Sequence, residues 1–503
     1  MGIELGSTRI KAVLCDESGK VLSVGAHEWE NILVDELWSY SLDEVKRGIQ
    51  ASYKRLTDNY GAKITRLDAI GISAMMHGYL AFDGNDNLLV PFRTWRNTNA
   101  AEAAEKLSDL FDFNVPMRWS VAHYYQSFSE GQDHIDKVEH LTTLAGYVHY
   151  MLTGKRVLGA GDASGMFPLC GNDYDKGMLK KFNSVIGRDF KRLLPEVLLA
   201  GKTAGTLTES GAKYLDPTGT LEAGAVFCPP EGDADTGMAA TNSVAPRSSN
   251  ISVGTSSFLM VVLEKALKRR YREIDMITTP DGAPVAMIHT NNGTTEINEW
   301  IELFSEVVSL FGASASKSEL FNKLFEKSEE SDACVGGLTG YNYLAGEPLS
   351  RTEKGAPLFM RSPDGALNLA NFMQMQIYSA IAAISLGTDI LEKENVRLSS
   401  VTAHGGFYKT EGIGQKATSA VLNAPVTVME NAGEGGAFGI ALLAGYILNN
   451  KLSLSEYLNG IFADTKKTTV TADEGEKAKC RAFLERYKKY LHVERLAAEA
   501  TDA

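Results

Sequence analysis

Apolar and polar positions near the N-terminus predict two strands joined by a tight turn. Apolar residues lie on both sides of a Gly-Ser-Thr step between Ile3 and Leu14, and Val21 to Val24 forms a second apolar run. The intervening segment Asp16-Glu-Ser-Gly19-Lys has the composition of a tight turn. We therefore expect a β-hairpin at the start of the chain.

A segment halfway along the chain repeats this pattern. The run from Ile251 to Leu263 again breaks at a glycine followed by hydroxyl residues, and then continues with apolar residues. Gly6 and Gly254 lie 248 positions apart in a chain of 503 residues. We interpret the two segments as a degenerate internal duplication, which predicts two α/β lobes with a ligand-binding cleft between them.

The boundary between the lobes is expected near residues 241–250, which are rich in Ser, Asn and Pro and precede the second hairpin. This assigns residues 1–245 to an N-terminal lobe and residues 246–503 to a C-terminal lobe. A loop is expected at residues 161–165. Helical spacing of apolar residues predicts helices at 140–154, 368–391, 434–448 and from 474 onward.

The composition excludes several classes of protein. The chain has 50 Lys and Arg against 63 Asp and Glu, a formal net charge of -13 and a pI near 5.3. Without a basic stripe to neutralise phosphates, nucleic acid is not an expected partner. Hydrophobic residues make up 44% of the chain, which is ordinary for a globular protein and excludes wholesale disorder.

The five cysteines are scattered, with no CxxC pair and no Cys/His spacing typical of zinc. We therefore expect reduced thiols and a cytoplasmic protein. The longest apolar stretch, 435–450, is shorter than the ~20 residues of a membrane span, and the N-terminus lacks the features of a secretory signal. No membrane anchor is expected. A homodimer is compatible with two lobes of this size, although no stretch identifies an interface.

Glu4 precedes a glycine turn that carries two hydroxyl residues, Ser7 and Thr8. The N–H and O–H groups of such a turn can surround phosphate oxygens, while a carboxylate holds Mg²⁺ directly or through water. By itself the motif is more often a structural strand end. The repeat Gly254-Thr255-Ser256 favours the phosphate interpretation, because a phosphate clamp between lobes requires two such hairpins.

A second motif places carboxylates in a glycine turn, Glu231-Gly-Asp233-Ala-Asp235, before small residues that predict a helix start. An Asp at this position can be a simple N-cap. Alternatively, an ionised Asp can accept the proton of a hydroxyl whose oxygen attacks phosphorus. We assign the base to Asp233 and expect Asp235 to cap the helix.

Two further motifs could orient ligands. An apolar strand ends in Met76-His77-Gly78, and Trp95-Arg96-Asn97 follows about twenty residues later. A lone His or Trp is more often structural, but His77 and Asn97 together with Asp233 supply the donors and acceptors that a polyhydroxylated ligand needs.

Gly405 and Gly406 follow a strand at 401–404. Glycines there allow a flat adenine ring to approach the backbone closely, although Gly-Gly alone is merely a turn.

In this order and spacing, the motifs resemble the FGGY family of carbohydrate kinases from Gly2 to about Tyr446. The resemblance implies two actin-like, ribonuclease-H-like lobes that close on Mg·ATP and a sugar and transfer a phosphoryl group to a primary hydroxyl. Met76 and His77 fall on the pair that contacts sugar hydroxyls in xylulokinase-like members, which indicates a ketopentose. Asp233 falls on the catalytic base, Gly254 and Thr255 on the phosphate-binding turn, and Gly405 and Gly406 on the adenine-binding turn.

The chain departs from the family pattern at four places. Gly6-Ser7 replaces the usual Gly-Thr, and Gly405-Gly406-Phe407-Tyr408 replaces the usual Gly-Gly-Gly-Ala, so we expect the two aromatic rings to narrow the nucleotide site or stack in it. Glu4 stands where the family usually has Asp, and Trp95-Arg96-Asn97 replaces a Trp-x-Asp-x-Arg segment of the sugar site. We expect an ATP- and Mg²⁺-dependent kinase for the C5 hydroxyl of D-xylulose or L-ribulose. The alternatives are a kinase for L-fuculose, L-rhamnulose or erythritol, a non-catalytic sugar and nucleotide sensor, and an actin-like or chaperone-like ATPase.

Overall fold

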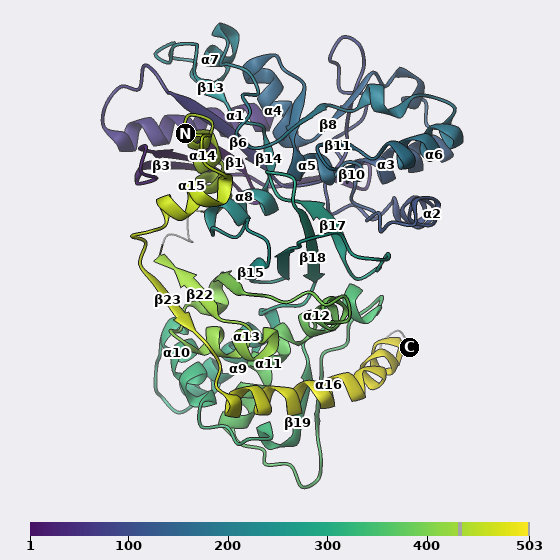
Figure 1. Cartoon of the computed structure of the whole chain (residues 1–503). Coiled ribbons are helices and arrows are strands. Elements are labelled where there is room, and N and C mark those ends of the chain that lie inside the picture. Colours follow the sequence, from purple (N-terminus) through teal and green to yellow (C-terminus); the bar gives the residue numbers. More distant parts are fainter. Residues whose placement is uncertain (431–434, 501–503) are drawn as a thin grey trace. The chain divides into compact units, whose positions relative to one another are not determined.

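Figure 1 shows the computed structural model of the chain, which describes residues 1–430 and 435–500. The chain forms two compact units, each assembled from separate segments: unit 1 from Met1–Pro246, Val262–Val285 and Glu434–Asp464, and unit 2 from Arg247–Val261, Ala286–Gly433 and Thr465–Ala503. The first segment of unit 1 ends close to the expected boundary at 245. Two later segments that the sequence division assigned to the C-terminal lobe belong to unit 1.

The main sheet of unit 1 has the strand order β13-β6-β1-β2-β3, and β14 also pairs with β6. β1, β2 and β3 form an antiparallel meander, whereas β1, β13 and β14 each run parallel to β6. The expected turn at 16–20 joins β2 to β3. The strands are β1 (Gly2–Leu5), β2 (Arg9–Cys15), β3 (Val21–Glu28), β6 (Ala69–Ala74), β13 (Val226–Phe227) and β14 (Glu231–Gly232).

Helices approach this sheet closely where it carries glycine. A β-carbon on Gly25 of β3 would lie 2.1 Å from the carbonyl oxygen of Ser52 in α1 (Leu42–Tyr60). A β-carbon on Gly2 of β1 would lie 2.2 Å from a carbonyl oxygen of α14 (Gly435–Tyr446). The helix expected at 434–448 is thus α14, and residue 434 lies outside the described residues.

Two expectations for unit 1 need correction. The helix expected at 140–154 begins later, because β8 (His140–Thr142) precedes α4 (Leu144–Thr153), whose N-terminus is capped by Thr143. The expected loop at 161–165 is mostly a short helix, α5 (Ala160–Ser164). Other elements of this unit are β4 (Ile32–Val34), β5 (Leu37–Ser39), β7 (Leu80–Phe82), β9 (Val157–Gly159), β10 (Leu169–Cys170), β11 (Asp173–Tyr174), β12 (Glu196–Leu198), β17 (Asp275–Thr278), α2 (Ala101–Phe111), α3 (Ser120–Ser129), α6 (Lys176–Ile186), α7 (Glu209–Leu215), α8 (Asp233–Ala240) and α15 (Leu454–Ile461).

The sheet of unit 2 runs in the order β18-β16-β15-β21-β22-β23. β15 pairs antiparallel with β16 and parallel with β21, which repeats the arrangement of β1 with β2 and β6 in unit 1. This repetition supports the internal duplication. The strands are β15 (Ser248–Val253), β16 (Ser257–Val262), β18 (Pro284–Thr290), β21 (Ser400–His404), β22 (Val426–Met429) and β23 (Lys467–Val470).

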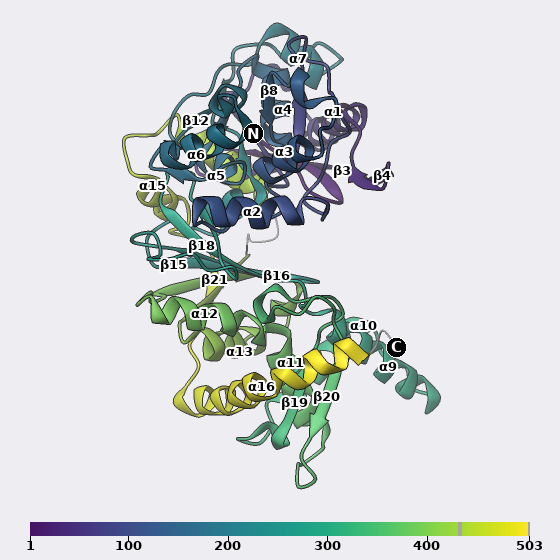
Figure 2. The same cartoon turned by 90° about the vertical axis from the view of Figure 1, so that its right-hand side faces the viewer.

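The helix expected at 368–391 is two consecutive helices, α11 (Leu369–Ala382) and α12 (Ile384–Lys393). The predicted tail helix is α16 (Glu474–Ala500), which lies beside α11 (Figure 2). No helix in the described ranges is both long and apolar enough to cross a membrane. Unit 2 also contains α9 (Thr295–Leu310), α10 (Lys317–Ser328), α13 (Ile413–Leu422), β19 (Leu338–Tyr341) and β20 (Leu358–Arg361).

Candidate active site

Three parallel strands of unit 1 bring predicted site residues to one edge of the sheet. Glu4 of β1 and Glu231 of β14 both lie opposite Ser73 of β6. Because parallel strands end at the same edge, the turns that follow them leave the sheet there, where α/β proteins commonly bind ligands. These turns are Gly6–Thr8, Met76–Gly78 and the start of α8 at Asp233.

Asp233 is a half-buried carboxylate with one oxygen held and one open. Its Oδ1 accepts hydrogen bonds from the N–H groups of Met76 at 3.1 Å and Ala234 at 3.0 Å. Its second oxygen, Oδ2, accepts no hydrogen bond from any other residue within the described ranges. Burial raises the pKa of the Asp233 carboxyl above its ordinary value. A fixed carboxylate with an open oxygen and a raised pKa has the properties of a general base.

Three buried carboxyls, those of Asp162, Glu231 and Asp235, surround this helix start. Asp162 and Glu231 were not predicted to be site residues. Burial, as the largest cause, raises the pKa of all three, and that of Asp162 to about 7. The expectation that Asp235 caps α8 is wrong, because the N-cap is Gly232. Both oxygens of Asp235 are buried without a hydrogen-bond partner in the part of the chain that is described.

Glu4 is half-buried, and its Oε2 accepts a hydrogen bond from the N–H of Ala437 at 3.1 Å. Burial and then repulsion from Asp233 raise the pKa of the Glu4 carboxyl to about 7. A bound divalent cation would offset this repulsion, and carboxylate oxygens are ligands that Mg²⁺ prefers. The described residues include no group of three His, Cys, Asp or Glu that could hold a metal ion.

The Met76–Gly78 turn has a strained backbone. His77 has a φ of 72° and Gly78 a φ of 91°, and a β-carbon on Gly78 would lie 2.6 Å from the Arg93 carbonyl oxygen. The His77 ring is buried and stacks on Trp119 with a centroid distance of 6.3 Å. Such strain persists only where the surroundings impose it, and it clusters at functional sites.

The Gly6–Thr8 turn has its carbonyl groups held and its amides open. Trp29 Nε1 donates to the Gly6 carbonyl at 2.7 Å, and the Trp29 N–H donates to the Thr8 carbonyl at 3.2 Å. The Ser7 carbonyl accepts a hydrogen bond from Tyr40 Oη at 2.6 Å. Within the described ranges, the N–H groups of Ser7 and Thr8 have no partner. Successive open N–H groups form a concavity that suits an anion.

Trp95 and Asn97 take different positions. The Trp95 side chain is 42% exposed, and its Nε1 donates to Ser7 Oγ at 3.3 Å. Asn97 is buried, its Oδ1 accepts from the Trp38 N–H at 2.8 Å, and its Nδ2 donates to the carbonyls of Trp38 at 2.8 Å and Thr94 at 3.2 Å. Because both Nδ2 donors are occupied, Asn97 fixes the backbone next to Trp95 rather than donating to a ligand.

Unit 2 contains a similar turn between β15 and β16. The Gly254 carbonyl accepts hydrogen bonds from the Thr294 N–H at 2.8 Å and from Thr294 Oγ1 at 3.0 Å. The Thr255 carbonyl accepts from the Gly293 N–H at 2.8 Å. The N–H groups of Thr255 and Ser256 have no partner among the described residues. This turn therefore offers an anion the same kind of open amides as Gly6–Thr8 does.

Gly405 and Gly406 follow β21 and lie beside this turn. Gly405 has a φ of 111°, and a β-carbon there would lie 2.3 Å from the carbonyl oxygen of Val253, the residue before Gly254. A β-carbon on Gly406 would meet no atom of the described residues within 4 Å. The glycine pair thus offers an open backbone surface next to the Gly254 turn.

The aromatic residues after the glycine pair do not line it. Phe407 and Tyr408 are buried, and the Phe407 ring packs edge-on against Phe325 with a centroid distance of 5.9 Å. Tyr408 Oη lies 3.1 Å from Thr418 Oγ1. The expectation that these two rings stack in the nucleotide site is therefore wrong, because both belong to the core of unit 2.

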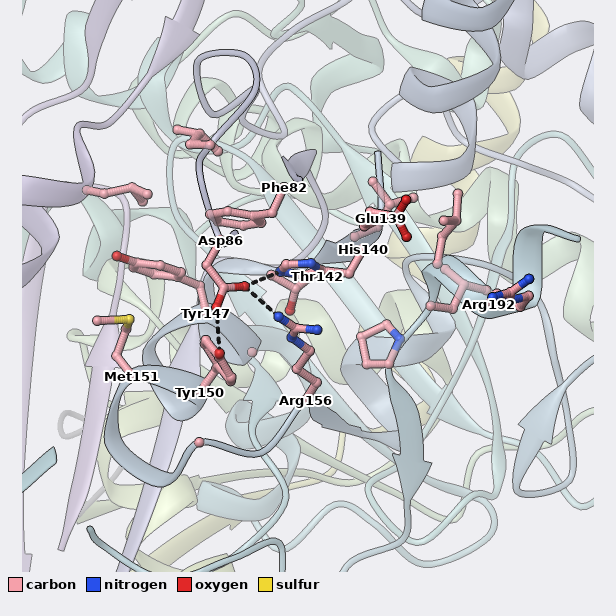
Figure 3. A pocket seen from close by; sticks show the side chains of 18 of the residues that line it. Phe82, Asp86, Glu139, His140, Thr142, Tyr147, Tyr150, Met151, Arg156 and Arg192 are labelled. Carbon is pink, nitrogen blue, oxygen red and sulfur yellow. Dashed lines mark hydrogen bonds and ion pairs between the residues drawn. The ribbon is translucent and has the colours of Figure 1, made fainter. Parts of the chain in front are cut away.

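A separate cavity of about 580 Å³ in unit 1 contains none of the predicted site residues. Its wall includes the parallel rings of Phe82 and His140, with centroids 5.0 Å apart (Figure 3). Asp86 accepts a hydrogen bond from Tyr150 Oη at 2.7 Å and pairs with Arg156. Because Asp86 is held by other residues of the wall and Asp233 is not among the lining residues, we do not take this cavity as the candidate site.

The predicted site residues thus fall into two sets. One set belongs to unit 1: Glu4, Ser7, Thr8, Met76, His77, Trp95, Asn97 and Asp233. The other belongs to unit 2: Gly254, Thr255, Gly405 and Gly406.

Comparisons with known proteins identify the family to which this chain is similar. The N-terminal domain of the FGGY family of carbohydrate kinases matches residues 1–220, and the C-terminal domain matches residues 249–448. A xylulose kinase of Haemophilus influenzae is 22% identical over 88% of this chain and 90% of its own. A gluconokinase of Bacillus subtilis is 21% identical over 95% of this chain and 92% of its own.

The fold agrees with a solved structure. A ligand-bound xylulose kinase of Lactobacillus acidophilus superposes with a TM-score of 0.82 at 16% identity, over 99% of both chains. This likeness confirms the expected α/β fold of two actin-like lobes. Since the two family matches together cover well over half of the sequence, the chain belongs to the FGGY family of carbohydrate kinases.

Proposed function

We propose that this sugar kinase transfers the γ-phosphoryl group of ATP to the terminal C5 hydroxyl of a ketopentose, D-xylulose or L-ribulose. The observation that carries the proposal is the geometry of the Asp233 carboxylate. Its Oδ1 accepts a hydrogen bond from the Met76 N–H, and its Oδ2 has no hydrogen-bond donor among the other described residues. The strained His77 turn lies directly beside it. A base next to a binding turn is what phosphoryl transfer to a positioned hydroxyl requires.

The proposed step moves one proton and one phosphoryl group. Asp233 Oδ2 accepts the proton of the C5 hydroxyl as that oxygen bonds to the γ-phosphorus of ATP. The bond from the γ-phosphorus to the bridging oxygen breaks, and ADP leaves with its electron pair. Asp233 can carry the proton until solvent removes it, because burial already raises the pKa of its carboxyl.

Backbone groups at three turns have the properties of nucleotide-binding groups. Open N–H groups at Ser7, Thr8 and Thr255 are suited to phosphate oxygens. The hydroxyls of the same residues can donate to phosphate as well. Gly254 gives its turn the space for close approach, and the open surface at Gly405 and Gly406 is suited to the adenine ring.

Mg²⁺ fits the residues at the end of β1. Glu4 supplies a carboxylate, and repulsion from Asp233 contributes to the raised pKa of this group, so that a cation would be favourable there. When bound, Mg²⁺ neutralises charge on the transferring phosphates. We assign Glu4 to hold it, directly or through water.

The sugar would contact Met76, His77 and the exposed Trp95. Asn97 would act indirectly, since it fixes the backbone around Trp38 and Thr94. Relatives named xylulose kinase support a pentulose. The relative named gluconokinase supports a sugar acid as the second candidate.

Mg·ATP turnover by coupled ADP release tests the substrate directly. We expect D-xylulose or L-ribulose to stimulate release with a kcat/KM at least tenfold above that of gluconate, L-fuculose, L-rhamnulose, erythritol or glycerol. A preference for gluconate would replace the pentulose assignment. Sugar-independent ADP release, or none with any sugar, would contradict the proposed function.

A further inference from the structure

Two buried aromatic side chains hold the Gly6–Thr8 turn from the side opposite to its open amides. Trp29 and Tyr40 are 4% and 3% exposed, and their rings stack with centroids 4.2 Å apart and planes at 28°. Trp29 Nε1 donates to the Gly6 carbonyl, and Tyr40 Oη donates to the Ser7 carbonyl. These two donors lie 23 and 33 positions away from their acceptors in the sequence.

Peptide geometry couples these bonds to the open amides. In a planar trans peptide, the carbonyl oxygen of one residue and the N–H of the next point in opposite directions. Fixing the Gly6 carbonyl therefore fixes the direction of the Ser7 N–H, and fixing the Ser7 carbonyl fixes that of the Thr8 N–H. Both N–H groups then point away from the aromatic pair and lack a partner in the described ranges.

We propose that Trp29 and Tyr40 are positioning residues for phosphoryl transfer, which aim the Ser7 and Thr8 amides at the phosphates of the nucleotide. This inference rests on the proposed function, because it takes the turn to be a phosphate site. Neither side chain touches the nucleotide in this account. They act through the backbone and remove the cost of ordering the turn when the nucleotide binds.

The chemistry of the pair suits this task. The indole N–H of Trp29 can donate a hydrogen bond but cannot accept one, so its polar atom always faces the Gly6 carbonyl as a donor. Burial, as the largest cause, raises the pKa of the Tyr40 hydroxyl, which keeps it a donor throughout the neutral range. The Trp29 N–H also donates to the Thr8 carbonyl, so three successive carbonyls are held by these two residues.

The first test is Tyr40→Phe, which removes one hydrogen-bond donor and keeps the ring. Tyr53→Phe is a matched control, because Tyr53 is buried in the same core and its hydroxyl has no partner in the described ranges. We expect Tyr40→Phe to lower kcat/KM for ATP about fivefold to tenfold, the range expected for one hydrogen bond. KM for the sugar should stay within about twofold of wild type.

Trp29→Phe is the second variant, because it removes the bond to Gly6 independently. Binding of Mg·AMPPNP without sugar, measured by calorimetry, should weaken in both variants and stay unchanged in Tyr53→Phe. Equal nucleotide binding and kinetics in Tyr40→Phe, Trp29→Phe and the control would overturn the inference, as would a wild type that binds no nucleotide. If wild type binds Mg·AMPPNP but no sugar stimulates ADP release, the proposed function fails, and the calorimetric comparison still decides the positioning role.

Discussion

The hairpins β1–β2 and β15–β16 present the same chemistry and are built differently. In unit 1, the turn carbonyls are held mainly by the side chains of Trp29 and Tyr40, from a distant part of the chain. In unit 2, the Gly293–Thr294 segment holds the carbonyls, mostly through its backbone. Both turns leave two successive amides open. The conformation of the turn is thus preserved although different groups hold its carbonyls in the two units.

The surroundings of the two turns differ as well. Glu4 stands two residues before Gly6, whereas Ser252 stands two residues before Gly254. The buried carboxyls of Asp162 and Asp235 and the half-buried carboxylate of Asp233 belong to unit 1. We infer that both turns bind phosphate and that Asp233 of unit 1 supplies the base.

The largest expected effect comes from removing the base. Asp233→Asn keeps the shape of the side chain and its acceptor for the Met76 N–H, but it cannot accept the hydroxyl proton. We expect kcat to fall at least ~10²-fold, the low end for general base catalysis, with nucleotide affinity little changed. Steady-state kinetics and calorimetry measure both quantities. If Asp233→Asn retained the wild-type kcat, Asp233 would not be the base, and the proposed difference in chemistry between the two units would be wrong.

A substitution at Gly293 can disrupt the contacts that hold the carbonyls of the Gly254–Ser256 turn in unit 2. A β-carbon there would lie 2.1 Å from the Gly254 carbonyl oxygen, so Gly293→Ala must displace the turn. We expect kcat/KM for ATP to fall about tenfold, roughly 1.4 kcal/mol. Gly460→Ala in α15 is the control, since a β-carbon there meets nothing within 4 Å. Unchanged ATP kinetics in Gly293→Ala would exclude this turn from the phosphate site.

The buried carboxyls of unit 1 predict a pH-dependent cost in stability. Burial raises the pKa of Asp235, and that of Asp162 to about 7, so the folded state binds more protons than the unfolded state above about pH 4. The free energy of unfolding therefore falls as pH rises from about 4 toward 7. Asp235→Asn should raise it at pH 8, with a smaller change at pH 5.

Thermal unfolding at pH 5 and pH 8 measures this effect. Asp216→Asn is a control of opposite sign, because hydrogen bonds from Thr218 and Leu221 hold the Asp216 pKa below its usual value. That variant should lose stability at pH 8. Equal stabilities of Asp235→Asn and wild type at both values of pH would show that Asp235 carries no such cost.

The smallest effect is expected at Gly406. Its surroundings leave space for a methyl group, so Gly406→Ala should not change the melting temperature. If the adenine ring lies on this surface, KM for ATP should rise about threefold, with KM for the sugar unchanged. An unaltered KM for ATP would place the adenine elsewhere.

Much of this arrangement could be predicted from the sequence. The glycine and hydroxyl residues of both hairpins, the strand before Met76 and the turn before Asp233 are local patterns, because each depends on a few adjacent residues. Their order along the chain was sufficient to indicate the family and the fold.

What the sequence did not predict depends on contacts between distant residues. Trp29 and Tyr40 hold a turn more than twenty positions away, and no local pattern marks that pairing. Asp235 is a residue type that commonly caps helices. In the structure, however, Gly232 is the N-cap of α8 and Asp235 is buried. Asn97 was expected to face a ligand, yet backbone groups of Trp38 and Thr94 occupy its amide.

The most direct test of the account is a crystal structure with Mg·AMPPNP and D-xylulose bound. The account predicts phosphate oxygens within about 2.7–3.2 Å of the amide nitrogens of Ser7, Thr8, Thr255 and Ser256. It also predicts that Asp233 Oδ2 hydrogen-bonds the C5 hydroxyl of the sugar. Phosphates bound away from both turns, or a C5 hydroxyl held by another residue, would contradict it.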